Sequence, residues 1–473
     1  MWNLNRMSTV SLYRQLIKLI ETLIASGKLA PGERLPAERM LSMQLEINRS
    51  TVIRAYDELS DRGLLIRRKG SGTYVNSDKW GVQNFAVLNW QGPSVASLSK
   101  REEAFRRRAL AEISTRKAKG DVFHDLSASH LAYDLLPNIR IAESAWRMAV
   151  ETEQGESAAY FGLSSLRQAV LNFLLRQSGL KVPEEEILIT SGARQAVFLI
   201  TQCLLKPGDA VGIESSSYFY SLPAFQAAGV RIFALPVDSK GITIEGLEAL
   251  AYRKTLKMIF LNPVFQNPTG SVMSEKRKKE VLAFCAAARI PVVEDDASSL
   301  LYFMNKKGIT PIKAYDRQGQ VIYIGSLSSY AGNRLRAGWL VAPSAVVRKL
   351  ADARLMIDAG LSVLPQILAL EYLNTIADMH LAAIRPELRK RAESLHERLS
   401  GIFNDKSGLS LPSGGLYSYA VFDAISEKNR LDMEERLLHA GFLATLGEAY
   451  GDMRCAFRFN HSLFNSPNLK YCQ

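Results

Sequence analysis

The sequence predicts two structural units of unequal size: a short basic unit of helices and a β-hairpin, followed by a large α/β domain. Three observations predict this organisation. Apolar residues recur at helical spacing within residues 11–26, and short helix and hairpin patterns follow. Positive charge is concentrated in the first 120 residues. From about residue 122 onward, short apolar strands alternate with helical stretches, which is typical of a mostly parallel sheet covered by helices.

The composition is that of a globular protein, with 47% hydrophobic and 22% charged residues in a chain of 473. The longest apolar runs are short and broken by charge, so no membrane span is expected. The N-terminus has no cleavable signal pattern. Four cysteines are far apart and form no CxxC pair, which argues against a disulfide framework or a metal site and favours a reducing cytoplasm; they are Cys203, Cys285, Cys455 and Cys472.

The net charge of +12 is unevenly distributed. Residues 1–80 hold 13 Lys and Arg against 8 Asp and Glu, a net charge of +5, and residues 81–120 hold 8 against 3, again +5. A basic end on a nearly neutral body predicts a polyanionic partner at that end. On charge alone, a basic surface that only favours solubility would be the favoured interpretation.

The first helix is predicted over residues 11–26, because six apolar side chains fall on one stripe and Gly27 follows as a stop. A Pro-Gly turn at 31–32 and then Pro36 introduce a second short helix that ends near Leu45. The segment that follows Leu45, EINRS, is polar and can start a third helix.

The third helix is predicted to start at a cap formed by Asn48 or Ser50 and to stop at Gly63. Two helices joined by about three residues form a helix-turn-helix arrangement. In that arrangement the start of the second helix, here Arg49 to Thr51, faces base edges in the major groove.

The segment after Gly63, LLIRRKGSGTYV, alternates apolar and polar residues around a glycine turn at 70–72. It is predicted to be a two-stranded wing whose tip carries Arg67, Arg68 and Lys69.

The stretches GERLPAER, NRSTVIRAYDEL and GSGTYV, in this order and spacing over residues 10–76, resemble the winged helix-turn-helix domain of the GntR regulators. The resemblance implies a DNA-binding domain over residues 10–77 and a set of DNA-facing residues: Arg34, Arg39, Arg49, Ser50, Thr51, Arg54, Arg68, Lys69, Gly72 and Thr73. Arg68 and Lys69 are expected to hold phosphates rather than read bases. For Arg39 and Arg54 the alternative is an ion pair on the helix surface with Glu38 or Asp57.

Residues 78–120 show no sustained core pattern, and a breaker lies at Trp90–Ser94. The stretch KREEAFRRRALAEISTRK could form a charged surface helix. We therefore expect a linker that lets the basic unit move relative to the body.

The large domain is predicted to contain six apolar strands, at 186–190, 210–215, 231–237, 258–263, 290–296 and 320–326. Several of them end in polar or turn residues. In open α/β sheets, ligands bind outside the carboxyl ends of the strands, so the residues that follow these strands are the candidates for a site.

Four motifs follow these strands in order: TSGARQAV, NPVFQNPTG, VVEDDASS and GSLSS, the last with Arg336 downstream. Together they resemble the fold-type I pyridoxal phosphate aminotransferases. With the N-terminal unit, nearly the whole chain resembles the MocR subfamily of GntR regulators. This resemblance implies that residues 121–473 form an aminotransferase-like effector and dimerisation domain with a small C-terminal α+β subdomain, and that the protein is a homodimer.

The resemblance implies a role for each motif residue. The cofactor phosphate would be held by Tyr160 of the partner subunit and, within one chain, by Gly192, Ala193, Ser326, Ser328 and Arg336. Backbone N–H groups at the start of a helix suit such an anion.

Four more residues would hold the ring and a bound ligand. Tyr218 would stack on the pyridine ring, and Asn267 would bond the ring oxygen. Asp295, chosen over Asp296, would pair with the pyridinium nitrogen, and Arg458 would clamp a ligand carboxylate. The alternatives are ordinary structural roles: a core tyrosine, a helix-capping aspartate and an arginine in an ion pair.

The sequence departs from the family pattern where the chemistry matters most. Ser329 stands at the position of the lysine that bonds the cofactor aldehyde. Nearby, Ala331 and Asn333 replace the usual leucine and proline, Ala297 replaces a tyrosine, and Arg194 replaces a common glutamine. These several changes favour natural divergence over a deliberate substitution at position 329.

A serine hydroxyl cannot replace the lysine amine as nucleophile and proton carrier, so transamination by the usual route should be absent. The nearest lysines lie outside this loop: Lys306, Lys307, Lys313 and Lys349. Two outcomes stay open: pyridoxal phosphate binds non-covalently, or the cofactor is lost and Arg458 holds another small carboxylate.

The sequence therefore predicts a cytoplasmic, DNA-binding transcriptional regulator that senses a small amine or carboxylate metabolite, or pyridoxal phosphate, without transaminase activity. Its expected partners are double-stranded DNA, the effector and a second copy of the chain, with no membrane. The alternatives are an aminotransferase that uses an unidentified lysine, and a purely structural dimer that positions the DNA-binding units.

Overall fold

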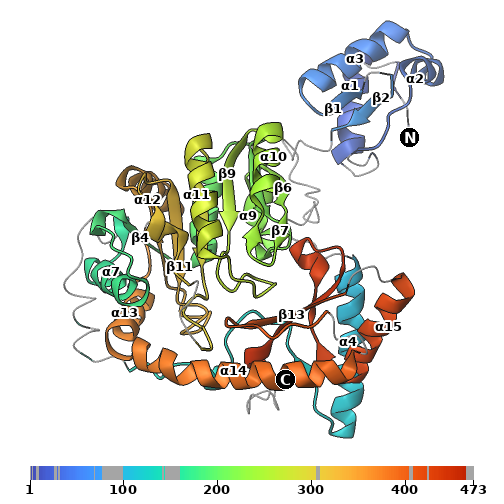
Figure 1. Cartoon of the computed structure of the whole chain (residues 1–473). Coiled ribbons are helices and arrows are strands. Elements are labelled where there is room, and N and C mark those ends of the chain that lie inside the picture. Colours follow the sequence, from blue (N-terminus) through green and yellow to red (C-terminus); the bar gives the residue numbers. More distant parts are fainter. Residues whose placement is uncertain are drawn as a thin grey trace. The chain divides into compact units, whose positions relative to one another are not determined.

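The computed structural model divides the chain into two compact units, residues 1–94 and 95–473 (Figure 1). It describes residues 2, 4–6, 10–25, 29, 32–68, 70–76, 100–140, 143, 147, 160–304, 309–358, 360–403, 408–422 and 426–464. Helices and strands are labelled as in Figure 1.

The first unit is a winged helix-turn-helix, as predicted. It consists of α1 (Leu12–Ala25), α2 (Glu38–Leu45) and α3 (Arg49–Asp61), followed by the antiparallel strands β1 (Leu65–Arg68) and β2 (Gly72–Val75). Asn48 rather than Ser50 caps α3, since its side chain accepts the N–H of Ser50 at 2.9 Å. The turn between α2 and α3 is thereby fixed.

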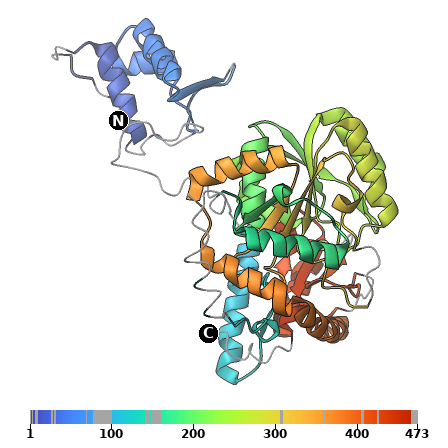
Figure 2. The same cartoon turned by 90° about the vertical axis from the view of Figure 1, so that its left-hand side faces the viewer.

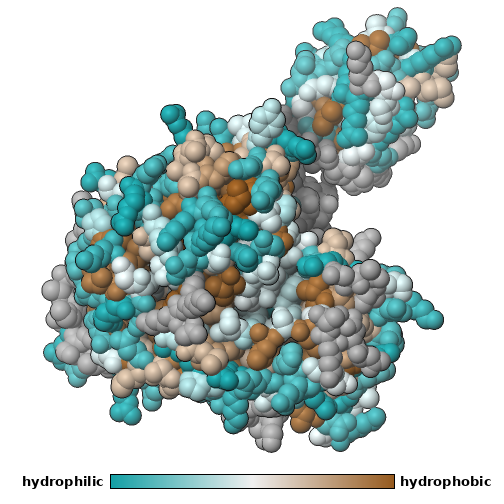
Figure 3. Space-filling view, in the orientation of Figure 1, coloured by the Kyte–Doolittle hydropathy of each residue, from teal (hydrophilic) through white to brown (hydrophobic). Residues whose placement is uncertain are grey.

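The winged-helix unit has a small core of its own. The fully buried side chains of Leu16 and Ile20 from α1 pack against Val52 and Tyr56 from α3. The Tyr56 hydroxyl donates to the carbonyl of Pro36 at 2.9 Å, ahead of α2. The visible surface of this unit is mostly hydrophilic with some hydrophobic patches (Figure 3), and Val10, Met40 and Met43 are exposed.

The second unit is built on a seven-stranded mixed sheet in which only β12 runs antiparallel to its neighbours. The strands, in spatial order, are β4 (Ile187–Thr190), β12 (Gly338–Val341), β11 (Val321–Ser326), β10 (Val292–Asp296), β9 (Leu256–Leu261), β5 (Ala210–Glu214) and β6 (Arg231–Leu235). A short hairpin of β7 (Val237–Asp238) and β8 (Gly241–Ile242) follows β6. The six predicted strands are confirmed within two residues at each end, and β12 was missed.

Helices cover both faces of this sheet (Figures 1 and 2). One face packs against α7 (Ser164–Ser178), α10 (Ile244–Lys254) and α11 (Glu275–Ala288), and the other against α8 (Ala193–Leu204), α9 (Pro223–Ala227) and α12 (Ser344–Asp358). Strand residues alternate between the faces, because successive side chains of a strand point to opposite sides. The strand core is therefore buried on both faces, as a parallel sheet requires.

The C-terminal part is an α+β subdomain, as the family resemblance implied. Its antiparallel sheet has the order β13 (Tyr417–Phe422), β16 (Cys455–Asn460) and β15 (Thr445–Leu446). Next to it lie α15 (Glu427–His439) and a parallel pair formed by β14 (Phe442–Leu443) and β3 (His124–Asp125).

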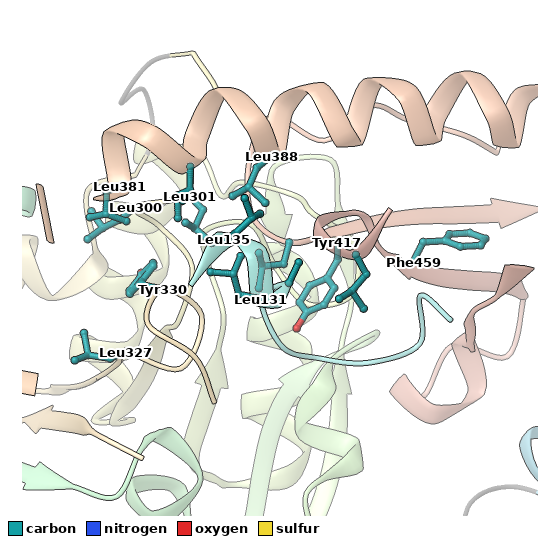
Figure 4. Close-up of a cluster of buried hydrophobic side chains, with 14 of the residues drawn as sticks. Leu131, Leu135, Leu300, Leu301, Leu327, Tyr330, Leu381, Leu388, Tyr417 and Phe459 are labelled. Atoms are coloured by element: carbon teal, nitrogen blue, oxygen red, sulfur yellow. The ribbon is translucent and has the colours of Figure 1, made fainter. Parts of the chain in front are cut away.

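A long helical arm joins the sheet domain to this subdomain. It runs through α13 (Val363–Glu371), a π-helical turn (Tyr372–Ile376) and α14 (Ala377–Ile402). The stretch Val363–Ile402 is the one described segment that meets the length and composition of a membrane span, because one 18-residue window within it has a mean hydropathy of 1.2. Leu381 and Leu388 nevertheless point from α14 into the buried cluster around Leu301 (Figure 4), which is the behaviour of a core helix.

Residues 100–119 correct the predicted linker. They form α4 (Lys100–Lys119), which packs beside α15 (Figure 1). Phe105 and Ala109 are fully buried, and so is Glu102. The buried face of α4 could not be recognised in the sequence, because one of its three residues is a carboxylate and most of the remaining helix positions are charged. Of the predicted linker, residues 78–99 lie outside the described residues.

Candidate functional site

Six strands of the large sheet end at one edge, because β4, β5, β6, β9, β10 and β11 all run in the same direction. The residues that follow them come from segments far apart in the sequence. This edge is where an open α/β sheet binds its ligands, and every strand-end motif of the sequence lies there.

The predicted phosphate cup forms at the end of β4. Gly192 has a left-handed φ of 102° and caps α8, whose first residue is Ala193. A Cβ placed on Gly192 would lie 3.6 Å from Nη2 of Arg336, so this guanidinium lies directly over the turn. Gly338 approaches so closely that a Cβ there would come within 2.8 Å of the Gly192 Cα. Helix N–H groups and a guanidinium thus face one small concavity, which suits a phosphate.

Two hydroxyls complete the predicted cup after β11. Ser326 Oγ donates to Ser328 Oγ at 3.1 Å, and the N–H of Ser328 donates to Ser326 Oγ at 3.2 Å. The next residue, Ser329, is half-buried in the same turn. Lys313 lies at the opposite end of β11, where its Nζ donates to the carbonyl of Val321 at 3.0 Å. Lys306 and Lys307 lie outside the described residues.

Asp295 is a buried carboxylate at the end of β10, with 2% exposure. The Tyr218 hydroxyl donates to its Oδ2, and its Oδ1 has no hydrogen-bond partner among the described residues. Burial raises the pKa of Asp295 to about 7, and nearby Asp296 adds to the shift. Asp296 points to the other side, where it accepts from the Tyr323 hydroxyl at 2.9 Å. Asp295 is therefore the aspartate that faces the predicted ring site.

Tyr218, predicted to stack on the ring, is bonded to the aspartate of the same site. Its hydroxyl is bonded to Asp295. Burial, and to a smaller extent the nearby Asp295 carboxylate, raises the pKa of Tyr218 well above its ordinary value. Arg194 is close enough to oppose this shift, so the residue that replaces the family's glutamine adds positive charge beside the ring site. A ligand with a ring nitrogen would share Asp295 with the tyrosine.

Asn267 connects the two halves of the site. Its N–H donates to Asn262 Oδ1 at 2.7 Å, and Asn262 Nδ2 donates to the carbonyl of Asp295 at 2.8 Å. Its own carbonyl accepts the N–H of Tyr218 at 3.0 Å, and its Oδ1 accepts from Arg458 Nη1 at 3.4 Å. The two buried charges, Asp295 and Arg458, are thus held in one hydrogen-bond network.

Arg458 is a buried cation in the middle of β16, with 2% exposure. Its Nη2 donates to the carbonyl of Ser127 at 2.7 Å and to Ser129 Oγ at 3.0 Å. Its Cζ lies 4.4 Å from the ring centroid of Tyr417 and 5.0 Å from that of Tyr450. No carboxylate lies within ion-pair distance of it among the described residues, and its Nε has no partner there. The charge is met only by neutral oxygens and two aromatic faces.

The other buried arginine of this region is neutralised in the usual way. Arg391 pairs with Asp134 and, at 2.8 Å, with Glu387. The predicted structural alternative for Arg458, an ion pair within the chain, is therefore not what the described residues show.

Tyr160 was expected to reach the phosphate of a partner subunit. Within its own chain, its hydroxyl contacts Asp352 and donates to the carbonyl of Arg348 at 3.2 Å, both on α12. Its role toward a phosphate depends on a second copy of the chain.

The predicted DNA-facing residues fall into three groups. Arg39, Arg49 and Ser50 are exposed at the starts of α2 and α3, and Thr51 is half-buried beside them. Glu38, the alternative ion-pair partner of Arg39, pairs instead with Arg49 of α3 at 3.5 Å.

Arg54 and Arg68 rest on aromatic rings of the unit. The Arg54 Cζ lies 4.6 Å from the ring centroid of Tyr13 on α1, and the Arg68 Cζ lies 4.9 Å from that of Tyr74. Arg54 is thus directed toward α1, and its predicted alternative pairing with Asp57 is replaced by a pair between Asp57 and Arg67 at 2.8 Å.

The wing residues Gly72 and Thr73 lie in different surroundings. The Arg34 side chain lies so close to Gly72 that a Cβ there would come within 2.9 Å of its Nε. Thr73 is only 8% exposed, and its carbonyl accepts the N–H of Leu35 at 2.9 Å. Thr73 therefore fastens the wing to the core instead of offering its side chain to DNA. Lys69 lies outside the described residues.

Sequence comparison agrees with this architecture. Residues 12–75 match the model of bacterial regulatory proteins of the gntR family, and residues 122–454 match that of aminotransferase class I and II. The HTH-type transcriptional regulator YisV of Bacillus subtilis (strain 168) is 32% identical over 99% of this chain and 96% of its own length. The chain belongs to the MocR subfamily of GntR transcriptional regulators. The regulator NorG of Staphylococcus aureus (strain USA300) is 28% identical over 93% of this MocR chain and 97% of its own.

Solved structures similar to this MocR protein are aminotransferases. The multiple substrate aminotransferase of Thermococcus profundus has a TM-score of 0.65 at 25% identity and covers 79% of this chain and 92% of its own. LysN, an alpha-aminoadipate aminotransferase of Thermus thermophilus complexed with N-(5'-phosphopyridoxyl)-L-leucine, has a TM-score of 0.63 at 26% identity over 77% and 94%. The second unit of the MocR chain thus has the fold-type I aminotransferase architecture.

Several residues around Arg458 were missed by sequence reasoning. They are Ser127, Ser129, Asn262, Tyr417, Thr445 and Tyr450. They contribute a carbonyl, hydroxyls, an amide and ring faces. Apart from Asn262, which begins the NPVFQNPTG motif, they come from segments without a local motif, so only the folded chain brings them together.

Asp295→Asn should make stability less dependent on pH. The pKa of Asp295 is raised to about 7 from an unfolded value of about 3.9, so its contribution is full below about pH 4 and is lost as pH rises through 7. Asparagine does not titrate, so the stability of the variant does not fall with pH for this reason. Urea unfolding of the large unit should therefore show a variant that gains stability relative to wild type between pH 5 and pH 8. Asp432→Asn, on the surface of α15, should track wild type; an equal offset for Asp295→Asn at both pH values would contradict the burial argument.

Arg49→Ala should weaken binding to DNA from upstream of the protein's own gene. Arg49 is exposed at the start of α3, and losing a base contact costs about 1–3 kcal/mol, or about 5- to 150-fold in affinity. Arg62→Ala, at the other end of α3 in an ion pair with Glu21, is the matched control and should bind as wild type does. Fluorescence anisotropy at fixed low salt measures both, and equal affinities for the two variants would argue against this docking mode.

Proposed function

We propose that this MocR regulator binds a small carboxylate-bearing ligand in its aminotransferase-like domain, alone or joined to pyridoxal phosphate, and does not transaminate it. The observation that carries the proposal is the buried guanidinium of Arg458, which meets no carboxylate among the described residues. A buried charge is costly unless it is paired. A ligand carboxylate bound bidentately would supply the missing anion.

The residues present fit pyridoxal phosphate held without a covalent bond. Its phosphate would lie on the cup of Gly192, Ala193 and Arg336, and the unpartnered Oδ1 of Asp295 would accept a protonated ring nitrogen. When bound, the group supplies an electron-withdrawing ring and an aldehyde. The chain's own residues bind and orient it: Asp295 holds a proton at the ring nitrogen, and Asn267 keeps Tyr218 and Arg458 in place.

Ser329 decides between holding a ligand and converting it. A hydroxyl does not bond an aldehyde as a lysine amine does, and it is a poor proton acceptor. An aminotransferase that uses another lysine is the competing function, and the position of Lys313 at the far end of β11 weighs against it.

The N-terminal unit would bind duplex DNA in the cytoplasm, with the start of α3 in the major groove. A second copy of the chain would complete the ligand site by bringing its own Tyr160 to the phosphate. Two copies would also present two winged-helix units to a pair of half-sites.

Arg458→Met should abolish most of the affinity for N-(5'-phosphopyridoxyl)-L-leucine, a stable compound that joins phosphate, ring and carboxylate without needing a lysine. Removing a charge-assisted bidentate contact should weaken calorimetric binding at least about 10-fold. Arg436→Met, in a surface ion pair on α15, is the control. Unchanged affinity in a folded Arg458→Met protein would remove Arg458 from the ligand site.

Wild-type protein incubated with pyridoxal phosphate and reduced with borohydride should carry no cofactor on any side chain. Ser329→Lys should become labelled at position 329, because the amine is restored where the cup presents the aldehyde. Peptide mass spectrometry distinguishes the two. A label on any lysine of the wild-type chain would support the aminotransferase alternative, and an unlabelled Ser329→Lys protein that still binds the phosphopyridoxyl compound would place the ligand differently.

A further inference from the structure

The first turn of α4 is fastened to the small subdomain by one buried carboxylate. Glu102 has no exposed surface. Its Oε2 accepts the N–H of Leu446 at 3.1 Å, and its Oε1 pairs with Arg106 one turn further along the helix at 2.8 Å. Leu446 is the second residue of the two-residue strand β15, so the position of β15 and that of α4 are tied together.

The first residue of β15 lies beside the ligand-binding arginine. Thr445 is paired with Arg458 across the β15–β16 ladder, and its Oγ1 lies 3.5 Å from Nη2 of Arg458. Thr445 Oγ1 also donates to the carbonyl of Ser127 at 3.1 Å, the same oxygen that accepts from Arg458 at 2.7 Å. One strand of two residues thus joins the guanidinium to the carboxylate of Glu102.

The chain that follows β15 touches the site a second time. Tyr450 lies with its ring 5.0 Å from the Arg458 Cζ, and its carbonyl accepts the N–H of Ser217, next to Tyr218, at 2.9 Å. Within the same segment, Glu448 lies 3.7 Å from Arg101 on α4. Residues 445–450 therefore contact the ligand site on one side and the first turn of α4 on the other.

α4 is also held to α15 by ion pairs. Arg101 Nε donates to Glu434 of α15 at 2.9 Å, and Arg108 pairs with the same carboxylate, which is 1% exposed. α4 begins at Lys100, and the chain preceding it leads to the winged-helix unit. α4 is therefore the first element that the structure describes after the winged-helix unit.

We propose that Glu102 is a positioning residue that couples the ligand site to the DNA-binding unit through β15 and α4. The inference rests on the proposed function, since it needs a ligand anion at Arg458. A carboxylate that engages Arg458 bidentately competes for the donors now given to Ser127 and shared with Thr445. β15 then shifts, and α4 follows because Leu446 N–H and the Glu102 carboxylate are buried partners that cannot separate cheaply. Ligand binding is thereby coupled to the state of the DNA-binding unit.

The coupling is measured as the ratio of DNA affinities with and without saturating N-(5'-phosphopyridoxyl)-L-leucine, using full-length protein. For wild type we expect a ratio of at least about five-fold, and the same factor when DNA is added to a titration of the compound. Glu102→Ala should bring both ratios to about one while the compound still binds. Glu102→Gln should keep most of the coupling, because its amide oxygen can still accept the Leu446 N–H.

Glu112→Ala is the matched control. Glu112 pairs with Arg116 on the same helix with the same spacing, at 2.9 Å, but is not bonded to β15. It should keep the wild-type ratio, and hydrogen exchange of the α4 amides should respond to the compound in this control but not in Glu102→Ala.

The outcomes separate the coupling from the function on which it rests. If wild type binds neither the compound nor DNA, the proposed function fails. If wild type shows the coupling and Glu102→Ala keeps it, or if Glu102→Gln loses it as completely as Glu102→Ala, this path through Leu446 is overturned while ligand sensing stands.

Discussion

A positive charge that is buried without a carboxylate is the constraint around which the ligand site is arranged. Both Nη atoms of Arg458 donate to neutral oxygens, its Nε has no partner among the described residues, and its Cζ lies near two tyrosine rings. These contacts reduce the cost of burial without cancelling the charge. On the other side of Asn267, Asp295 keeps an unpartnered oxygen. The fold therefore maintains two opposite charges in one network without letting them neutralise each other, and a ligand that carries both an anion and a protonated nitrogen matches both.

The sheet makes this arrangement possible. Parallel strands deliver their carboxyl ends to one edge, so Asp295, Asn267 and the Gly192 turn are neighbours although they are far apart in sequence. This part of the site could be predicted, since each strand and the motif behind it are local features. The missed strand, β12, begins with Gly338 directly after a turn-rich loop, so the sequence pattern gives no clear boundary between loop and strand.

What the sequence did not reveal depends on pairing between distant segments. α4 carries charge along most of its length, and its buried face includes Glu102, whose carboxylate is bonded by Arg106 and by the N–H of the distant Leu446. Thr73 lies on an alternating strand, but which face turns inward was settled by Leu35 from the other side of the domain. Likewise, most of the surroundings of Arg458 come from segments without a motif. Residue type alone does not fix such choices, because a polar side chain can be buried wherever the fold provides its partner.

The serine at position 329 and the coupling through β15 have a common logic. A ligand can shift a conformational equilibrium only by its difference in affinity for the two states, and it does so only while it stays bound. A lysine amine at position 329 would react with the ligand and release a changed ligand, so the binding contacts would not last. With a hydroxyl there, the contacts at the cup, Asp295 and Arg458 persist, so the strain that a ligand anion places on Thr445 and Leu446 lasts as long as the ligand does. Under the proposed function, loss of the nucleophile would leave a pocket whose occupancy the DNA-binding unit can follow.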